Sequence, residues 1–130
     1  MILLDTDICV EILRGNDQVR RRREETPEAV CTSFMTAAEL YYGARKSTKP
    51  ERNKDVVEVF LASLRVIQSD DQIVQKFGEI KGDLANEGEL VPDADLFVAA
   101  ASLCYCTKLV TGNTRHFDRI PDLELENWLE

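Results

Sequence analysis

The sequence lacks a hydrophobic run long enough to cross a membrane. Its longest apolar stretch, residues 96–101, is far shorter than the roughly 20 residues that a membrane-spanning helix needs. No positively charged segment followed by an apolar one stands at the start of the chain, so no secretory signal is predicted. We therefore expect a cytoplasmic protein without a membrane partner, whose four cysteines are buried free thiols: Cys9, Cys31, Cys104 and Cys106.

Histidine is scarce, and this argues against zinc chemistry. His116 is the only histidine, whereas protein zinc sites are built mainly from histidine and cysteine. Cys104 and Cys106 are two residues apart, so on a helix their side chains diverge. A cation bound by this chain must therefore take oxygen ligands, which Mg²⁺ and Mn²⁺ prefer.

Positive charge is also in short supply. The chain carries 16 Lys and Arg against 24 Asp and Glu, a net charge of -8, whereas nucleic-acid affinity normally comes from basic residues. The basic residues are clustered, however, which leaves an acidic centre with basic flanks possible. One run covers residues 20–23, a second covers residues 45–54, and a third covers residues 115–119. Solvated helix faces are an equally good interpretation of the first run.

The 130 residues, 44% hydrophobic and 31% charged, are typical of one compact domain, residues 1–130. Short apolar runs predict strands at 2–4, 29–32, 66–67 and 109–110, with an edge strand within 123–128. Periodic segments predict helices over residues 8–13, 37–44, 70–87 and 93–105. A charged helix that ends at residue 23, a long helix after Pro50 and a short helical turn at 115–117 are predicted as well. This alternation favours an α/β fold, a mostly parallel central sheet flanked by helices on both faces.

Acidic residues follow strands or begin helices in three separate segments. Asp5 directly follows the first apolar strand, where a carboxylate should face a cleft because burial in the core would be costly. Glu39 lies on an alanine-rich helix, for which Ser33 or Thr36 offers a cap. Asp95 lies in the first turn of another helix. A parallel sheet gathers such residues at its carboxyl edge, so the three carboxylates could hold Mg²⁺ or Mn²⁺.

Each of these acids also has an ordinary structural explanation. Asp5 and Asp7 could be helix-capping acids, although Thr6 or Asp7 is the residue we expect to cap the first helix. Glu39 could simply face solvent, and acids suit the first turn of a helix for dipole reasons alone. Asp93 is expected to be a helix cap, with an outer metal ligand as the lesser alternative.

Four segments, in order, resemble the motifs of PIN-domain ribonucleases of the VapC toxin type: Ile2–Ile8 (ILLDTDI), Thr36–Ala44 (TAAELYYGA), Pro92–Ala100 (PDADLFVAA) and Leu109–Phe117 (LVTGNTRHF). The closing segment 119–128 (RIPDLELENW) is also similar to the end of such toxins. The resemblance implies a PIN-like three-layer sandwich, a metal held by Asp5, Glu39 and Asp95, and a co-expressed antitoxin as partner. Asn113 stands where many PIN domains carry a fourth acid, and Asp7 replaces an expected asparagine.

The implied chemistry is metal-assisted hydrolysis of RNA phosphodiester bonds. A bound cation would supply a water nucleophile and neutralise charge that develops on the phosphate. Thr6, Thr111 and Asn113 are expected to orient water or phosphate, although turn chemistry explains Thr111 equally well. Basic residues near the end of the chain are expected to hold the RNA backbone: Arg115, His116 or Arg119.

Two other functions fit parts of the sequence. Asp5 and Asp7 have the spacing of the nucleophile and acid of a haloacid-dehalogenase-like phosphatase, but Lys108 precedes its strand instead of following it. A receiver-like phosphoacceptor module, which is not an enzyme, would need an acceptor Asp directly after the strand that ends at Ile67; Gln68 and Ser69 stand there. Both alternatives therefore lack a required residue.

A homodimer is expected as well. Two segments are more apolar than one small core requires. They are the segment around Tyr41 and Tyr42 and the helix with Val56, Val57 and Phe60. The antitoxin is expected to place an arginine among the clustered carboxylates and an apolar helix in a neighbouring groove.

Overall fold

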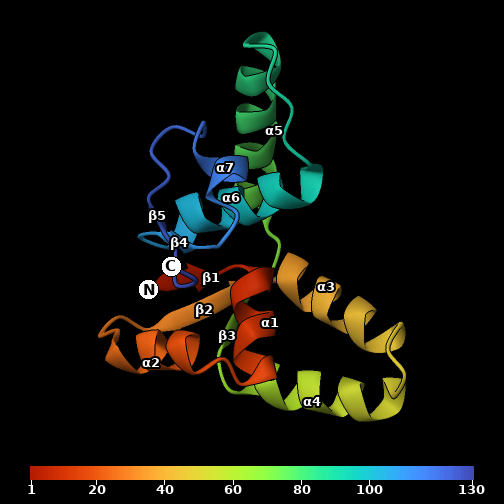
Figure 1. Cartoon of the computed structure of the whole chain (residues 1–130). Helices are drawn as coiled ribbons and strands as arrows, with labels where there is room; N and C mark the ends of the chain where they lie inside the picture. The colour runs from red at the N-terminus through yellow and green to blue at the C-terminus, as the bar shows by residue number, and fades with distance from the viewer.

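The computed structural model describes all 130 residues as a five-stranded sheet between two layers of helices (Figure 1). The strands are β1 (Ile2–Leu4), β2 (Val30–Ser33), β3 (Arg65–Ile67), β4 (Leu109–Val110) and β5 (Leu125–Glu126). They lie in the order β3-β2-β1-β4-β5, and every neighbouring pair is parallel. The predicted α/β fold is confirmed, and the edge strand joins the sheet in the parallel sense.

The position of β1 at the centre of the sheet explains why its sequence is continuously apolar. Side chains of a strand alternate between the two faces of the sheet. Ile2 and Leu4 pack into one core and Leu3 packs into the other, and all three are fully buried. A strand covered on both faces has no solvent side, so no polar residue interrupts it until Asp5.

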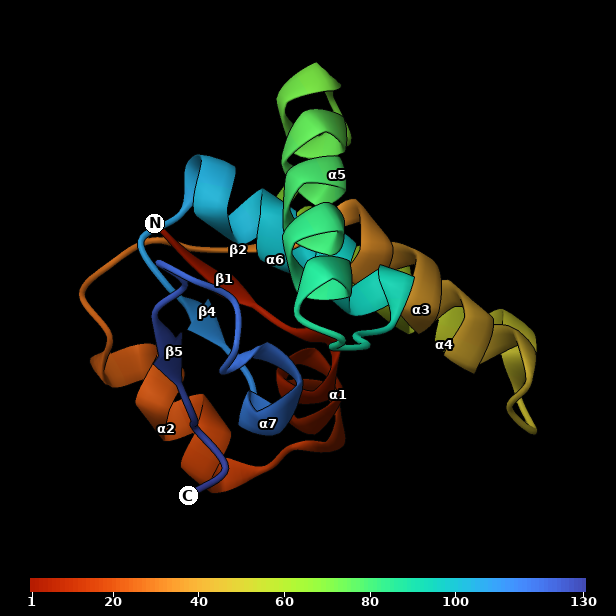
Figure 2. The ribbon, with the colours of Figure 1, turned by 90° about the horizontal axis from the view of Figure 1, so that it is seen from above.

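The two helical layers are unequal. The core on the face of the sheet that carries Ile2 and Leu4 is covered by four helices: α1 (Thr6–Arg14), α2 (Asp17–Glu25), α3 (Phe34–Arg45) and α4 (Pro50–Ala62). The opposite face is covered by α5 (Asp71–Asn86), α6 (Asp93–Tyr105) and the short α7 (Thr114–Phe117). Figure 2 shows α5 crossing α6, and the rings of Phe77 and Phe97 from these two helices stack with centroids 4.1 Å apart.

The residues that cap the helices agree only in part with those predicted from the sequence. Ser33 caps α3 by accepting a hydrogen bond from the backbone N–H of Thr36, as predicted. The cap of α1 is Asp5, however, and the prediction of Thr6 or Asp7 was wrong. Asp93 is the first residue of α6 and makes no capping hydrogen bond, so that prediction was also wrong. Its carboxylate instead accepts from the Lys81 Nζ at 2.9 Å.

The apolar surface expected for a dimer is smaller than the sequence indicated. Val57 and Phe60 are only 5% and 7% exposed because they pack into the core of their own chain. Tyr41 and Tyr42 of α3 and Val56 of α4 are exposed.

All four cysteines are free thiols, as expected; Cys9 and Cys31 are buried, while Cys104 and Cys106 are half-buried. No helix combines the length and the apolar character that a membrane crossing requires.

Candidate active site

The pairing of β1 with β4 places Asp5 beside Thr111. Leu4 lies opposite Val110 in the register, so the residues that follow each strand emerge together. The Asp5 backbone N–H donates to the Val110 carbonyl at 2.9 Å, and the Thr111 Oγ1 donates to the Asp5 Oδ2 at 2.8 Å. The other carboxylate oxygen, Oδ1, accepts from the Thr6 backbone N–H at 2.8 Å.

Asp5 is a buried carboxylate that is poorly compensated. Asp5 is only 5% exposed, and this burial raises the pKa of its carboxyl group from 3.8 to about 6. The hydrogen bonds from Thr111 and Thr6 lower the pKa, but the negative charges of Asp7 and Asp95 raise it. Three carboxylates from two helices therefore lie close enough to repel one another.

Asp7 holds the loop after β4 in place. Its Oδ2 accepts from the Gly112 backbone N–H at 2.8 Å, and its Oδ1 accepts from the Ile8 backbone N–H at 2.8 Å. A Cβ atom at Gly112 would lie 2.7 Å from that same Oδ2 and 2.5 Å from Leu129 Cδ1, so only glycine fits. Burial raises the pKa of Asp7 too. Helix capping was the structural role expected for Asp7, whereas the observed contact across 105 residues fixes the loop after β4.

Glu39 reaches the site through Thr6. The Thr6 Oγ1 donates to the Glu39 Oε1 at 2.9 Å, and it also lies 2.9 Å from the Thr36 Oγ1. Because β2 runs into α3 without a loop, Thr36 and Glu39 lie in the first two turns of α3, just beyond the carboxyl end of β2. Thr36 is fully buried, and sequence reasoning treated it only as a possible cap.

Asp95 and His116 form a pair at the opposite side of the cluster. The His116 Nδ1 lies 2.8 Å from the Asp95 Oδ2, joining the first turn of α6 to α7. His116, predicted to hold RNA, is thus already engaged by one of the predicted metal ligands. The sequence separation of 21 residues hides this contact from any local pattern.

The remaining predicted residues surround this cluster without joining it. The Asn113 backbone N–H donates to the Thr111 Oγ1 at 3.0 Å, but its side chain makes no capping bond to α7. Arg119 pairs with Glu89, and Arg115 makes no ion pair.

The donor set fits a hard divalent cation better than any other group. No lysine or arginine forms an ion pair with Asp5, Asp7, Glu39 or Asp95, and the only partner among the chain's nine pairs is His116. The available ligand atoms are carboxylate oxygens, which suit Mg²⁺ or Mn²⁺. Three such groups do not yet close around one point, because Glu39 is bonded to Thr6 and Asp95 to His116.

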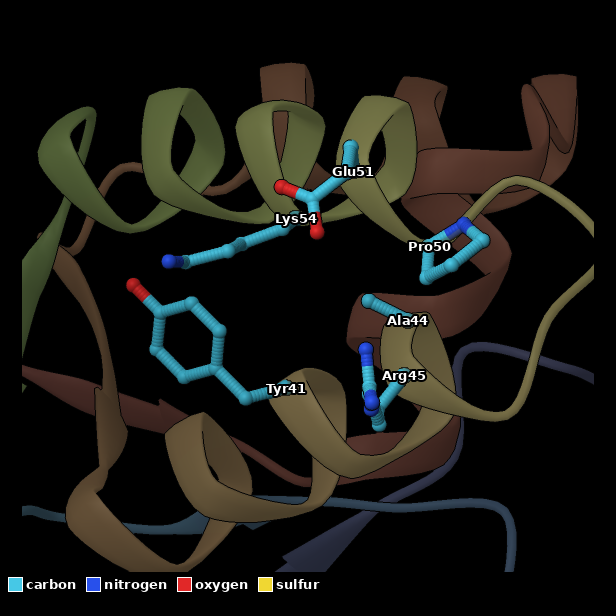
Figure 3. A pocket seen from close by; sticks show the side chains of 6 residues that line it. All are labelled: Tyr41, Ala44, Arg45, Pro50, Glu51 and Lys54. Carbon is cyan, nitrogen blue, oxygen red and sulfur yellow. The ribbon is translucent and has the colours of Figure 1, made fainter.

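None of the four carboxylates lines the pocket that is formed on α3. It has a volume of about 380 Å³ between α3 and α4, and Figure 3 shows the residues that line it: Tyr41, Ala44, Arg45, Pro50, Glu51 and Lys54. Tyr41 is two residues from Glu39 on the same helix. Arg45 and Lys54 bring two residues of the basic segment 45–54 to this pocket.

The poor compensation of Asp5 predicts a pH-dependent gain in stability on Asp5→Asn. A raised pKa means that the folded protein binds the proton more tightly, so this residue's contribution to stability is present below about pH 4 and is lost as the pH rises to about 6. At pH 7.5, in chelator, Asp5→Asn should be more stable than the parent by about 1–3 kcal/mol in urea unfolding. The difference should vanish at pH 4.

Asp93→Asn is the matched control, since Asp93 is exposed and already paired with Lys81. It should show no gain at either pH. A parent protein that is more stable than Asp5→Asn at pH 7.5 would contradict the assignment of Asp5 as an uncompensated buried charge.

Comparison with known proteins places this site in a family. Residues 2–123 match the model of the PIN domain. The chain is 36% identical over 128 residues to Ribonuclease VapC2 of Haemophilus influenzae, covering 98% of this chain and 97% of that protein. It is also 36% identical over 127 residues to the tRNA(fMet)-specific endonuclease VapC of Salmonella typhimurium, covering 97% and 96%. The crystal structure of DNA-bound VapBC from Salmonella typhimurium superposes with a TM-score of 0.91 at 36% identity, over 98% of this chain and 97% of that one. The chain therefore belongs to the PIN-domain family and, within it, to the VapC ribonucleases.

Proposed function

We propose that this chain is a divalent-metal-dependent endoribonuclease and the toxin of a toxin–antitoxin pair. One observation supports this function most strongly: a cluster of carboxylates at the carboxyl edge of the sheet has no lysine or arginine partner within the chain, and its one basic contact is His116 with Asp95. Its relatives are named as ribonucleases, and this makes RNA the substrate class. The Salmonella relative's name makes tRNA(fMet) the first RNA to test.

Asp5, Glu39 and Asp95 would hold the cation. Bound there, Mg²⁺ or Mn²⁺ would supply a water nucleophile at neutral pH and offset the charge that develops on the scissile phosphate. Thr111 fixes the orientation of the Asp5 carboxylate by donating to it, and Thr6 does the same for Glu39. Asp7 fixes the loop that carries Thr111 and Asn113, so it acts as a positioning residue.

Basic residues on the flanks would bind the RNA backbone. Arg115 lies on α7 without an ion-pair partner, next to His116 at the edge of the cluster. Arg45 and Lys54 line the pocket beside α3 (Figure 3). Contacts of this kind position a nucleic acid without selecting its sequence. The net charge of -8 is compatible with RNA binding, because the basic residues are clustered in the sequence instead of evenly spread.

The two other functions gain no support. Both oxygens of Asp5 accept hydrogen bonds, and no lysine contacts Asp5 or Asp7 as a phosphatase would require. At the end of β3, the first acid is Asp70, which caps α5 and accepts a hydrogen bond from the Tyr105 hydroxyl instead of facing an open pocket.

An antitoxin would dock on the apolar groove between α1, α2 and α4. The groove has a volume of about 460 Å³, with an apolar floor and one charged residue of each sign: Ile12, Leu13, Arg20, Asp55, Val56, Val59 and Phe60. VapBC complexes, one of them described as a toxin-antitoxin system, are among the solved structures that match this chain. An amphipathic partner helix suits such a groove.

Substitution of the three carboxylates tests the activity. We expect Asp5→Asn, Glu39→Gln and Asp95→Asn each to reduce Mg²⁺-dependent cleavage by about 100-fold or more, since each removes a charge needed to hold the cation. The measurement is gel analysis of total RNA and of tRNA(fMet), with Mg²⁺ or with chelator, followed by mapping of the cut ends. Asp93→Asn, whose carboxylate binds Lys81, should retain most of the activity. Full cleavage by folded Asp5→Asn protein would overturn the assignment.

The antitoxin should compete with metal. An arginine from the partner could make paired bonds to two of the clustered carboxylates, satisfying the charge that a cation would otherwise satisfy. Calorimetric titration of Mn²⁺ into the free chain and into its antitoxin complex should show weaker metal binding by the complex. Replacement of the inserted arginine by alanine should restore metal affinity and weaken inhibition. Equal affinities in the two titrations would rule out the arginine mechanism.

A homodimer remains part of the proposal. Tyr42 is 65% exposed on α3, and it lies beside Tyr41 at a surface that a second copy could cover. Sedimentation at micromolar concentration should give twice the chain mass of 14.8 kDa. Tyr42→Asp should shift the chain toward monomer, whereas Val74→Asp, an equally simple change at an exposed residue of α5, should not. A parent protein that sediments as a monomer would contradict this prediction.

A further inference from the structure

Cys31 and Cys106 lie in contact at the end of the molecule opposite the carboxylate cluster. Their Sγ atoms are 3.4 Å apart, although 75 residues separate them in the chain. Cys31 lies in β2, paired with Leu3 in the sheet, and Cys106 is the residue at which α6 ends. A disulfide has a sulfur–sulfur distance of about 2.05 Å, so only a small approach separates the two thiols from a bond.

The two thiols differ in accessibility. Cys31 is fully buried, and its Sγ also lies 3.3 Å from the Ile2 carbonyl oxygen. Cys106 is half-buried, so a small reagent reaches the pair from its side. The hydrogen bond from Cys31 holds the pKa of Cys106 below its usual range, while the same contact and burial raise the pKa of Cys31. Cys106 is therefore the better nucleophile of the two.

The other cysteines do not share this arrangement. Burial raises the pKa of Cys9 to about 12, and its weak contacts are with Thr32 and the Leu4 carbonyl. Cys104 has no hydrogen-bonded partner, and burial raises its pKa. A metal site is not formed either, because no third cysteine, histidine or acidic side chain joins the pair.

We propose that Cys31 and Cys106 form a dithiol–disulfide exchange site that reacts with low-molecular-weight disulfides such as oxidised glutathione. The Cys106 thiolate attacks one sulfur of the reagent, forming a mixed disulfide and releasing the first thiolate. The Cys31 sulfur then attacks the Cys106 sulfur, forming the internal disulfide and releasing the second thiolate. The two cysteine protons end on the two released thiols, so two protein thiols are oxidised and one disulfide is reduced.

The bridge would fasten the end of α6 to the sheet. Thr107, directly after Cys106, donates its backbone N–H to the Met1 carbonyl at 2.9 Å, so the bridge lies beside the start of β1. Asp95 lies at the opposite end of α6, a helix of 13 residues and thus about 20 Å long. Oxidation should therefore raise thermal stability and leave the carboxylate cluster unchanged. This inference does not depend on the proposed ribonuclease activity.

Peptide mapping of the full chain tests the site directly. Trypsin leaves Cys31 in peptide 24–45 and Cys106 in peptide 82–108, but the latter also contains Cys104. The experiment therefore uses Cys104→Ser protein, incubated with oxidised glutathione and digested without reductant after free thiols are alkylated. The expected product is the cross-linked pair of these peptides, and dithiothreitol should remove it.

Thermal unfolding provides the second readout. Because the bridge closes a loop of 75 residues, the oxidised Cys104→Ser protein should unfold at a temperature higher than the reduced form by on the order of 10 °C. Cys104→Ser/Cys106→Ser protein is the matched control, in which glutathione should change neither the peptide map nor the midpoint. The proposal is overturned if both thiols of the Cys104→Ser protein are alkylated after oxidation, or if Cys106 remains a glutathione mixed disulfide while Cys31 is free.

Discussion

The structure depends above all on the burial of β1 between two neighbours and two helical layers. A strand covered on every side can carry no polar side chain along its length, so its first polar residue appears where the strand ends. That residue is Asp5, and the register of Leu4 with Val110 delivers Thr111 to its side. The position of the functional cluster thus follows from the same constraint that makes the core.

The second consequence of this burial is electrostatic. Asp5 and Asp7 follow one strand, Asp95 lies in the first turn of α6, and each contributes negative charge at the same edge of the sheet. A protein can tolerate such a cluster only because the surrounding core stabilises the fold by much more than the repulsion costs. No lysine or arginine forms an ion pair with these carboxylates. Uncompensated negative charge concentrated at one place is what a site for a cation requires.

The sequence predicted the elements well because their patterns are local. The alternation of short apolar runs with periodic segments was enough to predict the parallel sheet and its flanking helices. Predictions failed where the outcome depended on distant partners. Capping of α1 by Asp5 was only an alternative to Thr6 or Asp7, since a strand-end acid and a helix cap look alike until the backbone path is known. Val57 and Phe60 were expected to contribute to a dimer surface, but contacts with the core on the Ile2 and Leu4 face of the sheet bury them.

The same limit applies to the site. Asp5, Glu39 and Asp95 can be identified as candidates from strand ends, helix starts and motifs, but the contacts that orient them join residues far apart in the chain. Asp7 with Gly112 and Asp95 with His116 are examples, and no periodicity of either segment contains them. Thr36 was missed as a neighbour of Thr6 because threonine has an ordinary role at a helix start.

The carboxylate edge also links ligand binding to folding. A group whose pKa is raised by burial is a group whose charged form the folded state disfavours. Any positive charge that enters the cluster relieves this cost, so its binding free energy includes the repulsion that it removes. A metal ion and a guanidinium differ in chemistry, but they relieve the same repulsion and therefore compete for it. A ligand that binds only the folded chain stabilises the fold. Under the proposed function, a metal ion and an antitoxin arginine would each stabilise the chain by relieving the same repulsion at this edge of the sheet.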